Sequence, residues 1–503
     1  MTPRIRTASI FGLEAQLVDV EADISPGLPA FIIVGLPDTA VQEARERVRS
    51  ALKRSGFPFP RTRVTVNLAP ADAKKAGTGF DLPIALAILI ANGDLPGTGM
   101  EAPLTVGELS LDGTLRPVPG TLSAALVATN AGISELIVPP ENGEEAALVP
   151  TLTVRTAGTL RDVAEHLMKK AELPIVPPRQ IHIEQDPRIS VDFASIRGQE
   201  SAKRALEIAA AGGHNILLQG PPGSGKTLLA RAFPGVLPAL TVEETLEVTK
   251  IHSVAGLLPP HDVARERPFR SPHHSASGAA LVGGGAVPKP GEVSLAHRGV
   301  LFLDEFPEFS RHVLEHLRQP LEDGIVTVSR ASGSASFPAR FTLVAAMNPC
   351  PCGFATDEER ACSCTPTQIE RYGRRLSGPL LDRIDLLIEV PRVPTAKLSE
   401  LEPGEPSSAI RTRVQTARDI QTTRYASRGL ICNAELGSGD LRTFAAPDAE
   451  AKALLETAVD RFKLSARAYF RILRVARTIA DLSGSETIRN VHTAEALQYR
   501  KLL

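Results

Sequence analysis

Short apolar runs alternate in the first third of the chain with longer segments whose apolar residues recur at helical spacing. The predicted elements are strands at Phe31–Gly35, Arg63–Leu68 and Glu135–Pro139, and helices at 38–55 and 121–131. Strands and helices that alternate in this way are typical of an α/β domain. We place this domain at residues 1–173.

A proline-rich stretch separates this domain from a second one. Residues 174–190 contain four prolines and no helical period, which predicts a linker. From 191 to 399, short β-rich runs alternate with helical patterns, as in a nucleotide-binding domain with a parallel sheet. The pattern is helical from there to the end, so we predict a helical lid over residues 400–503.

The second domain carries a phosphate-binding loop. The sequence GPPGSGKT follows an apolar strand at Asn215–Gln219 and precedes a helical pattern at Leu228–Phe233, which is the context that this motif requires. Its glycines let backbone N–H groups wrap phosphates, Lys226 can neutralise the β and γ phosphates, and the Thr227 hydroxyl can ligate Mg²⁺. The expected cofactors are ATP and Mg²⁺, and the predicted binding residues are Gly220, Pro221, Pro222, Gly223, Ser224, Gly225, Lys226 and Thr227.

Polar side chains follow two further apolar strands of the same domain. Asp304 and Glu305 come directly after Gly299–Leu303, and Asn348 ends the strand Phe341–Met347. We predict that Asp304 holds Mg²⁺, that Glu305 orients and deprotonates the attacking water, and that Asn348 senses the γ-phosphate. The alternatives are solvated acids at a strand end and a turn-forming Asn before proline.

Two arginines are candidates for stabilising the transferred phosphoryl group. Arg383 precedes a predicted strand, and Arg467 lies with Arg471 and Arg474 at helical spacing in the lid. A guanidinium can stabilise the spreading negative charge and often comes from a neighbouring subunit. We predict a catalytic role for Arg383 and a second sensor at Arg467; the alternative for both is a solvated helix face.

Four of the five cysteines fall within one short segment, as Cys350, Cys352, Cys362 and Cys364. Four thiolates suit tetrahedral Zn²⁺, although the C-x-C spacing is shorter than the common C-x₂₋₄-C. We therefore expect a structural zinc ion and keep free or redox-active thiols as the alternative. Cys432 is expected to pack in the core, and the adjacent His273 and His274 to form structural hydrogen bonds.

Composition limits the classes of partner. The chain has 56 basic and 57 acidic residues, so nucleic-acid contact must be local, and the absence of Trp argues against an aromatic platform for stacked bases. The apolar run Leu82–Ala91 contains a proline and is far shorter than the roughly 20 residues of a membrane-spanning helix. The first residues lack the apolar segment of a signal peptide. We expect a cytoplasmic protein with no membrane contact.

The ATP-site residues and the segment RPFRSPHHSASGAALVGGGAVPKPGEVSLAHRGVLFLDEFPEF (Arg267–Phe309) closely resemble the YifB/ComM family of Mg-chelatase-like AAA+ proteins. Further segments that carry the resemblance, which runs nearly end to end, are Gly35–Leu52, Gly198–Thr227 and NPCPCG (Asn348–Gly353), with SGPLLDRID and ARTIADLSGSE. The resemblance implies an α/β fold with a parallel-sheet AAA+ core, an insert in its second helix, a β-hairpin before the first sensor, a helical lid and assembly into a hexameric ring.

The resemblance also implies where DNA binds. The insert corresponds to about Ile251–Arg298 and the hairpin lies within Ile325–Phe341, both facing the central pore. Small residues at the hairpin tip suit close approach to a phosphate backbone, and Arg330 or Lys289 can supply charge for sequence-independent binding. The alternative is a surface hairpin that packs on a neighbour.

The first domain looks like the Lon-protease domain but lacks its catalytic pair. The helix at Leu122–Ala124 has no lysine, and the expected serine region, Lys75–Asp81, has no serine. Peptide hydrolysis then has no nucleophile and base, and Thr78 with Lys74 or Lys75 is a weak substitute. We expect an interaction or DNA-guiding collar.

Three functions follow from these patterns. The first is a ring-shaped motor on branched or single-stranded DNA, for which the family resemblance implies branch migration during recombination, as in natural transformation. The second is a chelatase-type ATPase that remodels a protein partner. The third, an ATP-dependent protease, is disfavoured by the missing pair.

Overall fold

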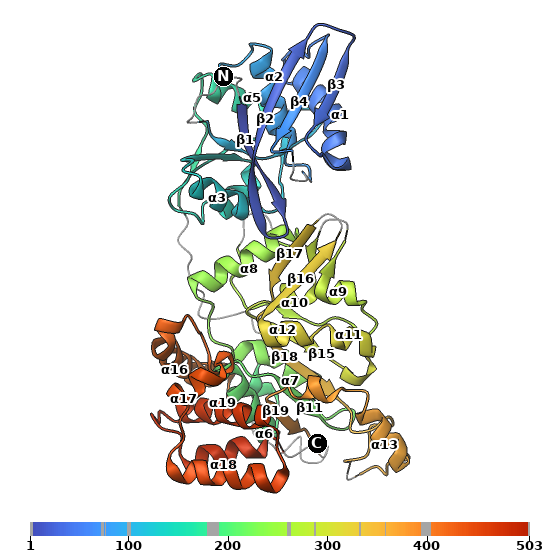
Figure 1. Ribbon diagram of the computed structural model, residues 1–503, viewed down its shortest axis with the longest axis vertical. Helices are drawn as coiled ribbons and strands as arrows, with labels where there is room; N and C mark the ends of the chain where they lie inside the picture. Colours follow the sequence, from blue (N-terminus) through green and yellow to red (C-terminus); the bar gives the residue numbers. More distant parts are fainter. Residues whose placement is uncertain are drawn as a thin grey trace.

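The computed structural model describes residues 4–71, 75, 77–97, 102–178, 191–258, 263–285, 288–330, 333–357, 359–393 and 404–500. In this part of the chain the N-terminal domain stands at one end of an elongated molecule, and the core and the lid form the other (Figure 1). No helix within the described ranges combines the length and the apolar character needed to cross a membrane. The predicted α/β fold with a parallel-sheet core and a C-terminal helical region is confirmed.

The N-terminal domain is built on an eight-stranded mixed sheet. Its strands, in spatial order, are β10 (Ile175–Val176), β9 (Thr153–Thr156), β8 (Glu135–Val138), β5 (Leu104–Thr105), β1 (Arg4–Phe11), β2 (Glu14–Ser25), β4 (Arg63–Ala69) and β3 (Ala30–Val34). In β4 the alternate residues Val64, Val66 and Leu68 are fully buried, as expected for a strand with one face on a core. The helices are α1 (Thr39–Arg54), α2 (Asp81–Ala91), α3 (Thr121–Asn130), α4 (Gly143–Ala146) and α5 (Leu160–Leu167).

The sheet extends into the segment that we predict as a linker. Ile175 and Val176 form β10, which pairs antiparallel with β9. Two apolar residues between prolines can form such a short edge strand, because a proline is tolerated where no ladder hydrogen bond is needed. The predicted linker is therefore occupied at its start by the last strand of the domain, and residues 179–190 lie outside the described residues.

The core contains a five-stranded parallel sheet that fixes the position of the candidate site. Its strands are, in spatial order, β12 (Phe269–Arg270), β15 (Val300–Leu303), β18 (Thr342–Met347), β11 (Ile216–Gln219) and β19 (Leu386–Glu389). In the central register Ile216 lies opposite both Val344 and Leu386. The carboxyl ends of β11, β15 and β18 consequently share one edge, where the residues after parallel strands meet.

The core helices and the inserted elements surround this sheet (Figure 1). They are α6 (Glu200–Gly212), α7 (Lys226–Ala232), α8 (Val242–Val254), α9 (Gly278–Val282), β13 (Gly283–Gly284), β14 (Lys289–Pro290), α10 (Glu292–Leu295), α11 (Arg311–Glu315), α12 (Arg318–Asp323), β16 (Ile325–Arg330), β17 (Gly333–Pro338), α13 (Pro366–Gly373) and α14 (Gly378–Leu381). The predicted hairpin is present as the antiparallel pair β16 and β17.

The lid consists of helices that share one hydrophobic core with the sheet domain. They are α16 (Ser407–Tyr425), α17 (Ser438–Phe444), α18 (Ala449–Phe462), α19 (Ala466–Leu482) and α20 (Asn490–Gln498). The predicted packing role of Cys432 is confirmed, since this residue is buried against Gly213 at the end of α6.

A buried carboxylate joins the N-terminal domain to the core. Glu145 accepts hydrogen bonds from the Leu122 amide (2.7 Å) and from the Ser253 hydroxyl of α8 (2.5 Å). The Ser253 oxygen in turn accepts from the Gly120 amide at 2.8 Å. Burial raises the pKa of Glu145. Because Ser253 of α8 reaches both Glu145 and the Gly120 amide only when α8 lies against α3, the network favours one arrangement of the two parts.

Candidate active site

The GPPGSGKT loop joins β11 to α7 at the carboxyl edge of the core sheet. Gly223 and Gly225 have φ angles of 78° and 93°, a region that side chains rarely adopt. At Gly220 an added Cβ would lie 2.1 Å from the Val390 carbonyl oxygen, so only glycine fits there. The Ser224 hydroxyl is buried and has no hydrogen-bond partner among the described residues. Open glycines and an unsatisfied donor around one loop fit the predicted role in holding phosphate oxygens.

Lys226 lies at the first position of α7 and points back over the loop. Its Nζ donates to the carbonyls of Gly220 (2.7 Å) and Pro221 (2.8 Å) and to Asn348 Oδ1 at 3.3 Å. Burial lowers the pKa of Lys226 to about 8, and the carboxylate of Asp304 opposes this shift. A desolvated ammonium beside an anion-binding loop gains strongly from a phosphate partner.

The pH dependence of nucleotide binding follows from that pKa. Below pH 8 Lys226 is mostly charged, whereas above it ATP must bind together with a proton. We expect ATP affinity to fall about fivefold between pH 8 and pH 9, because the charged fraction falls from about one half to about one eleventh. Equilibrium titrations with a fluorescent ATP analogue measure this. Lys226→Arg, which stays charged, should show no such fall, and a flat profile for the wild type would contradict the assignment.

The predicted magnesium ligands lie together. Thr227 Oγ1 donates to Asp304 Oδ2 at 2.9 Å, which brings the loop hydroxyl and the carboxylate from the end of β15 to one point. A hydroxyl and a carboxylate are oxygen ligands of the kind that Mg²⁺ prefers. The donor set therefore fits the metal that we predict for this site.

Glu305 is the exposed carboxylate beside the predicted metal ligands. Its φ of 50° places it in the left-handed region, which is uncommon for a residue with a side chain. The backbone N–H of Glu305 donates to Asp304 Oδ1 at 2.9 Å. This local conformation lets the carboxylates of Asp304 and Glu305 point in different directions. Their predicted tasks, metal binding and water activation, require different directions.

His274 is a site residue that the sequence analysis missed. Its Nδ1 lies 3.1 Å from Glu305 Oε2, and its ring is tilted by 34° against that of His273 at a centroid distance of 4.1 Å. His273 Nδ1 contacts the Ser275 hydroxyl at 2.8 Å, in line with the structural role that we predict for it. The sequence separation of His274 from Glu305 conceals their contact, and the neighbouring prolines and serines indicate only a turn.

The two candidate arginines lie at the opposite edge of the sheet from the phosphate-binding loop. Arg383 precedes β19 and is buried, with its guanidinium paired to Glu322 of α12 and hydrogen-bonded to the Pro379 carbonyl at 2.7 Å. Burial and the positive charges of Arg318 and Arg467 lower the pKa of Arg383. The solvated alternative is wrong for Arg383, and the amino end of a parallel strand cannot reach the nucleotide held at the carboxyl ends in the same chain.

Arg467 occupies the same side of the molecule. It is exposed in the first turn of α19, and Arg471, one turn later, donates to Asp385 Oδ1 at 2.6 Å beside the start of β19. Asp385 also accepts from the Asn215 amide at 3.0 Å, which ties this edge to the start of β11. The structure brings Arg467 and Arg383 together and separates both from the loop of their own chain.

The predicted DNA contacts lie at the junction of the core and the N-terminal domain. Val326, Val328 and Phe337 bury one face of the β16–β17 hairpin, and an added Cβ at Gly12 would touch Ala335 at 2.8 Å. The other face carries Ser329 and Ser334, whose hydroxyls lie 3.0 Å apart. Lys289 is exposed in β14. The side chain of Arg330 lies outside the described residues.

The positions related to a protease lie at a cavity of about 340 Å³ between the N-terminal domain and the core. Thr78, Gly79 and Ala124 line it, and no serine does so among the described residues. Lys75 is fully buried and donates to the Pro70 carbonyl. Lys74 lies outside the described residues. The geometry offers no support for Thr78 as a nucleophile activated by Lys75.

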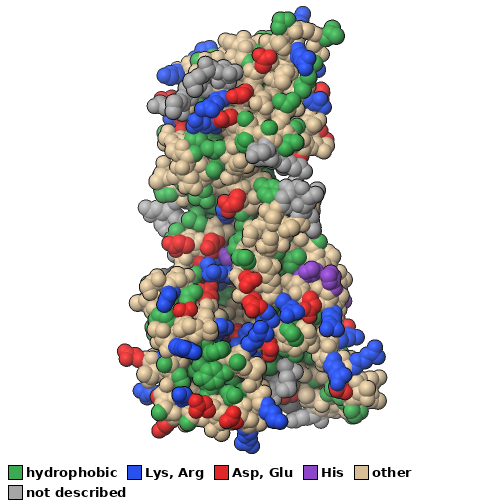
Figure 2. All heavy atoms as spheres, viewed as in Figure 1, with side chains coloured by type: hydrophobic (Ala, Val, Ile, Leu, Met, Phe, Trp, Pro, Cys, Tyr) green, Lys and Arg blue, Asp and Glu red, His purple; other side chains and the backbone are tan. Residues whose placement is uncertain are grey.

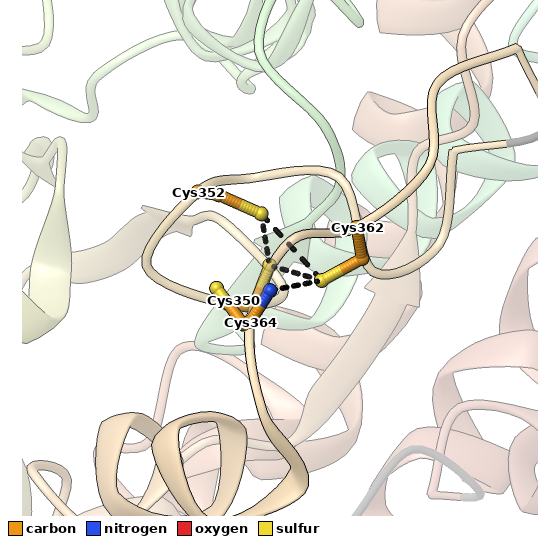
Figure 3. A group of neighbouring side chains, drawn as sticks. All are labelled: Cys350, Cys352, Cys362 and Cys364. Atoms are coloured by element: carbon orange, nitrogen blue, oxygen red, sulfur yellow. Dashed lines mark hydrogen bonds between the residues drawn. The ribbon is translucent and has the colours of Figure 1, made fainter.

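The four clustered cysteines converge in the loop after β18 (Figure 3). Their sulfur atoms all lie within 4.8 Å of one another. This arrangement is compatible with a zinc site.

Comparison with known proteins places these features in a family. The model of "Magnesium chelatase, subunit ChlI" matches residues 192–398, that of "Subunit ChlI of Mg-chelatase" matches 20–142, and that of the "subunit ChlI C-terminal" region matches 404–500. Competence protein ComM of Haemophilus influenzae is 47% identical over 98% of this chain and 96% of its own length. YifB of Escherichia coli is 45% identical over 99% of this chain and 97% of its own.

A more distant similarity connects the chain to chelatase subunits. The magnesium-chelatase 67 kDa subunit of Chlorobaculum parvum is 32% identical over 32% of this chain and 23% of its own length. This match is partial, whereas the similarity to ComM and YifB runs almost from end to end. Together with the phosphate-binding loop, the adjacent carboxylates and the parallel-sheet core, it shows that the chain belongs to the YifB/ComM family of Mg-chelatase-like AAA+ ATPases.

Proposed function

We propose that this protein is a ring-forming DNA motor that uses ATP hydrolysis to promote branch migration during recombination, as in natural transformation, in the cytoplasm. The observation that carries the proposal is the end-to-end similarity to a competence protein, together with an ATP site whose candidate arginines face away from the nucleotide of their own chain. Competence is the capacity to take up DNA, and a recombination motor acts on DNA taken up in this way.

The chain supplies a residue for each part of phosphoryl transfer. ATP, when bound with Mg²⁺, supplies the free energy that is released when its terminal phosphoryl group is transferred to water. The loop amides and Lys226 would bind and neutralise phosphate oxygens, while Thr227 and Asp304, which are hydrogen-bonded to each other, would hold the metal. Glu305 would orient a water molecule and take its proton, and Asn348, which accepts from Lys226, would sense the γ-phosphate.

A ring of identical subunits accounts for the position of the arginines. Arg383 and Arg467 lie at the amino edge of the sheet, so they can complete only the ATP site of another copy. A head-to-tail contact that brings this edge to the next copy's carboxyl edge closes into a ring when the rotation is right. We propose six copies, as the family resemblance implies.

DNA contact by the pore-facing hairpin fits the surface of the molecule. On the face shown in Figure 2, Lys and Arg side chains are interspersed with Asp and Glu over the core and the lid, and they form no continuous basic surface. Contact with the phosphate backbone then has to be local. The hydroxyls of Ser329 and Ser334 in the hairpin, together with Lys289 of β14 and Arg330, can contact phosphates without reading bases.

The alternatives have less support. A chelatase-type remodelling ATPase is favoured by the matches to the models of magnesium-chelatase subunit ChlI and by the partial similarity to the 67 kDa subunit, whereas the similarity to competence protein ComM covers 98% of the chain. An ATP-dependent protease needs a nucleophile and a base, and the cavity at Thr78 and Ala124 provides no serine among its described residues. Casein degradation and chelatase complementation assays test these two alternatives.

We propose in addition that Zn²⁺ is a structural cofactor at Cys350, Cys352, Cys362 and Cys364. The proposal rests on four thiol sulfurs within 4.8 Å of one another.

Trapping on DNA tests the motor proposal. Glu305→Gln should bind ATP without hydrolysing it, so a ring closed around DNA should persist. We expect a gel-stable complex of this variant with forked or four-way DNA in the presence of ATP. The double variant Glu305→Gln, Lys226→Ala should form no such complex. Glu305→Gln without ATP is the control. Failure to form any complex, at salt concentrations where sequence-independent binding is strong, would favour the chelatase alternative.

A further inference from the structure

The loop after Asn348 brings four cysteine sulfurs to one point (Figure 3). The Cys350 sulfur lies 3.4 Å from that of Cys352 and 3.6 Å from that of Cys362, and the latter two lie 3.5 Å apart. The Cys364 sulfur completes the group, with all four atoms within 4.8 Å of one another. Two separate C-x-C pairs have therefore folded onto one centre.

These distances match a metal site and exclude disulfides in this conformation. A disulfide joins its sulfurs at about 2.0 Å. In a tetrahedral zinc site with Zn–S bonds of about 2.3 Å, the sulfurs lie about 3.8 Å apart. Three of the sulfur pairs lie 3.4 to 3.6 Å apart, and all four sulfurs lie within 4.8 Å of one another. These distances lie on either side of the value of about 3.8 Å expected for zinc. Thiols are weak hydrogen-bond donors, so four of them have little reason to converge without a shared ligand.

The cysteine loop rests directly on the phosphate-binding loop. Cys350 is fully buried two residues after Asn348, whose side chain accepts from Lys226. The Gly353 amide donates to the Cys350 carbonyl at 3.0 Å, and Gly353 has a φ of 89°. An added Cβ at Gly353 would lie 2.6 Å from Pro222 Cδ and 3.8 Å from Asn348 Cγ. The backbone between the two cysteine pairs thus packs against both the loop and the sensor.

Ion pairs connect the cysteine loop, and the helical segment that follows it, to two other segments of the core. Arg392, just after β19, pairs with Asp357 (3.9 Å) and Glu359 (3.7 Å) of the cysteine loop. After Cys364 the chain enters α13, and Arg375 beyond that helix binds Glu308 at 2.7 Å, three residues after Glu305. The cysteine loop therefore packs against the sensor and the phosphate-binding loop, and the helical segment that follows it connects to the segment after the acidic strand end.

We propose that a zinc ion bound by Cys350, Cys352, Cys362 and Cys364 holds this loop in the shape that positions Pro222 and Asn348, so that ATP affinity depends on the metal. Metal binding by the two cysteine pairs restricts the conformations of the segment that contains Gly353. Because Gly353 contacts Pro222 directly, the same restriction limits the positions that Pro222 can take. The inference rests on the ATP site of the proposed function and needs no DNA.

Metal content and ATP affinity test the first half of the inference. We expect about one zinc per chain in the purified wild type and in Cys432→Ser, whose cysteine is buried elsewhere. The double variant Cys352→Ser, Cys364→Ser should lose the metal and bind a fluorescent ATP analogue about tenfold more weakly, a typical loss when the support of a site is removed. Should that variant fail to fold, removing zinc from the folded wild type with a chelator provides the same comparison.

A matched pair of glycine variants tests the coupling while all four cysteines stay in place. Gly353→Ala should keep its zinc and lose ATP affinity, because its Cβ clashes with Pro222 and its φ disfavours a side chain. Gly373→Ala in α13 meets nothing within 4 Å and should bind ATP like the wild type. Circular dichroism confirms that both are folded.

The outcomes separate this inference from the motor proposal. Absence of zinc from the wild type, or wild-type ATP affinity in the folded metal-free protein or in Gly353→Ala, overturns it. Loss of both zinc and ATP affinity in the cysteine variant, with zinc kept and affinity lost in Gly353→Ala, supports it. A protein that behaves in this way but ignores DNA refutes the motor proposal alone.

Discussion

Glu305→Gln is expected to lower steady-state ATP hydrolysis by about 10²- to 10⁴-fold and to leave ATP bound. Glutamine keeps the shape of the side chain and its contact with His274 Nδ1 at 3.1 Å, but it cannot accept a proton from water. The hydrogen bonds of Lys226 to the Gly220 carbonyl and of Thr227 to Asp304 do not involve Glu305, so the residues predicted to hold the nucleotide and the metal stay in place in this variant. Phosphate release measures turnover, and a fluorescent ATP analogue measures binding.

A nearby carboxylate supplies the control for this substitution. Glu308 lies three residues after Glu305 and pairs with Arg375 at 2.7 Å. Because it has no part in the proposed water activation, Glu308→Gln should keep turnover within a few-fold of the wild type. Similar losses in both variants, or wild-type turnover in Glu305→Gln, would contradict the assignment of Glu305 as the base.

Arg383→Ala is expected to reduce ATP turnover by about 10³-fold or more with little change in ATP affinity, the effect of losing an arginine supplied in trans. Its guanidinium lies at the edge of the sheet that faces away from its own phosphate-binding loop. Mixing two inactive variants tests whether the arginine acts on the ATP site of a neighbouring subunit. In a mixed ring, Lys226→Ala subunits carry an intact arginine and Arg383→Ala subunits carry an intact loop, so activity should partly return.

The ion pair of Arg383 with Glu322 provides a second control. Glu322→Gln removes the charge partner and keeps the arginine, so it should retain most of the turnover. Thermal unfolding of each variant shows whether the loss of this ion pair, in which only Arg383 is buried, has destabilised the chain. The trans assignment is wrong if mixing restores nothing although both variants are folded and assembled.

Much of the ATP site could be predicted because its signals are local in sequence. The GPPGSGKT loop lies between a strand and a helix, and Asp304 and Asn348 end neighbouring strands whose carboxyl ends must meet in a parallel sheet. The predicted strands Arg63–Leu68 and Phe341–Met347 agree with β4 and β18 within one residue at each end. The agreement follows from the apolar pattern, because β4 has alternately buried residues and β18 is buried at every residue.

The remaining features depend on contacts that no local pattern indicates. His274 of the insert contacts Glu305, and the buried Arg383 pairs with Glu322 of a helix that is distant in sequence. The contact of Gly353 with Pro222 needs a close approach of two loops, and the sequence shows only a glycine among cysteines. Nor does periodicity indicate that Glu145 joins two domains through Ser253, because an acidic residue in a short helix is usually solvated.

The most direct test of the account is the rate of ATP hydrolysis by the wild-type protein measured with and without four-way DNA. If ATP held by Lys226 and cut with Glu305 drives movement on DNA, four-way DNA should raise the rate, and Lys226→Ala should show no turnover under either condition. An unchanged rate at saturating four-way DNA, or full turnover by Lys226→Ala, would contradict it.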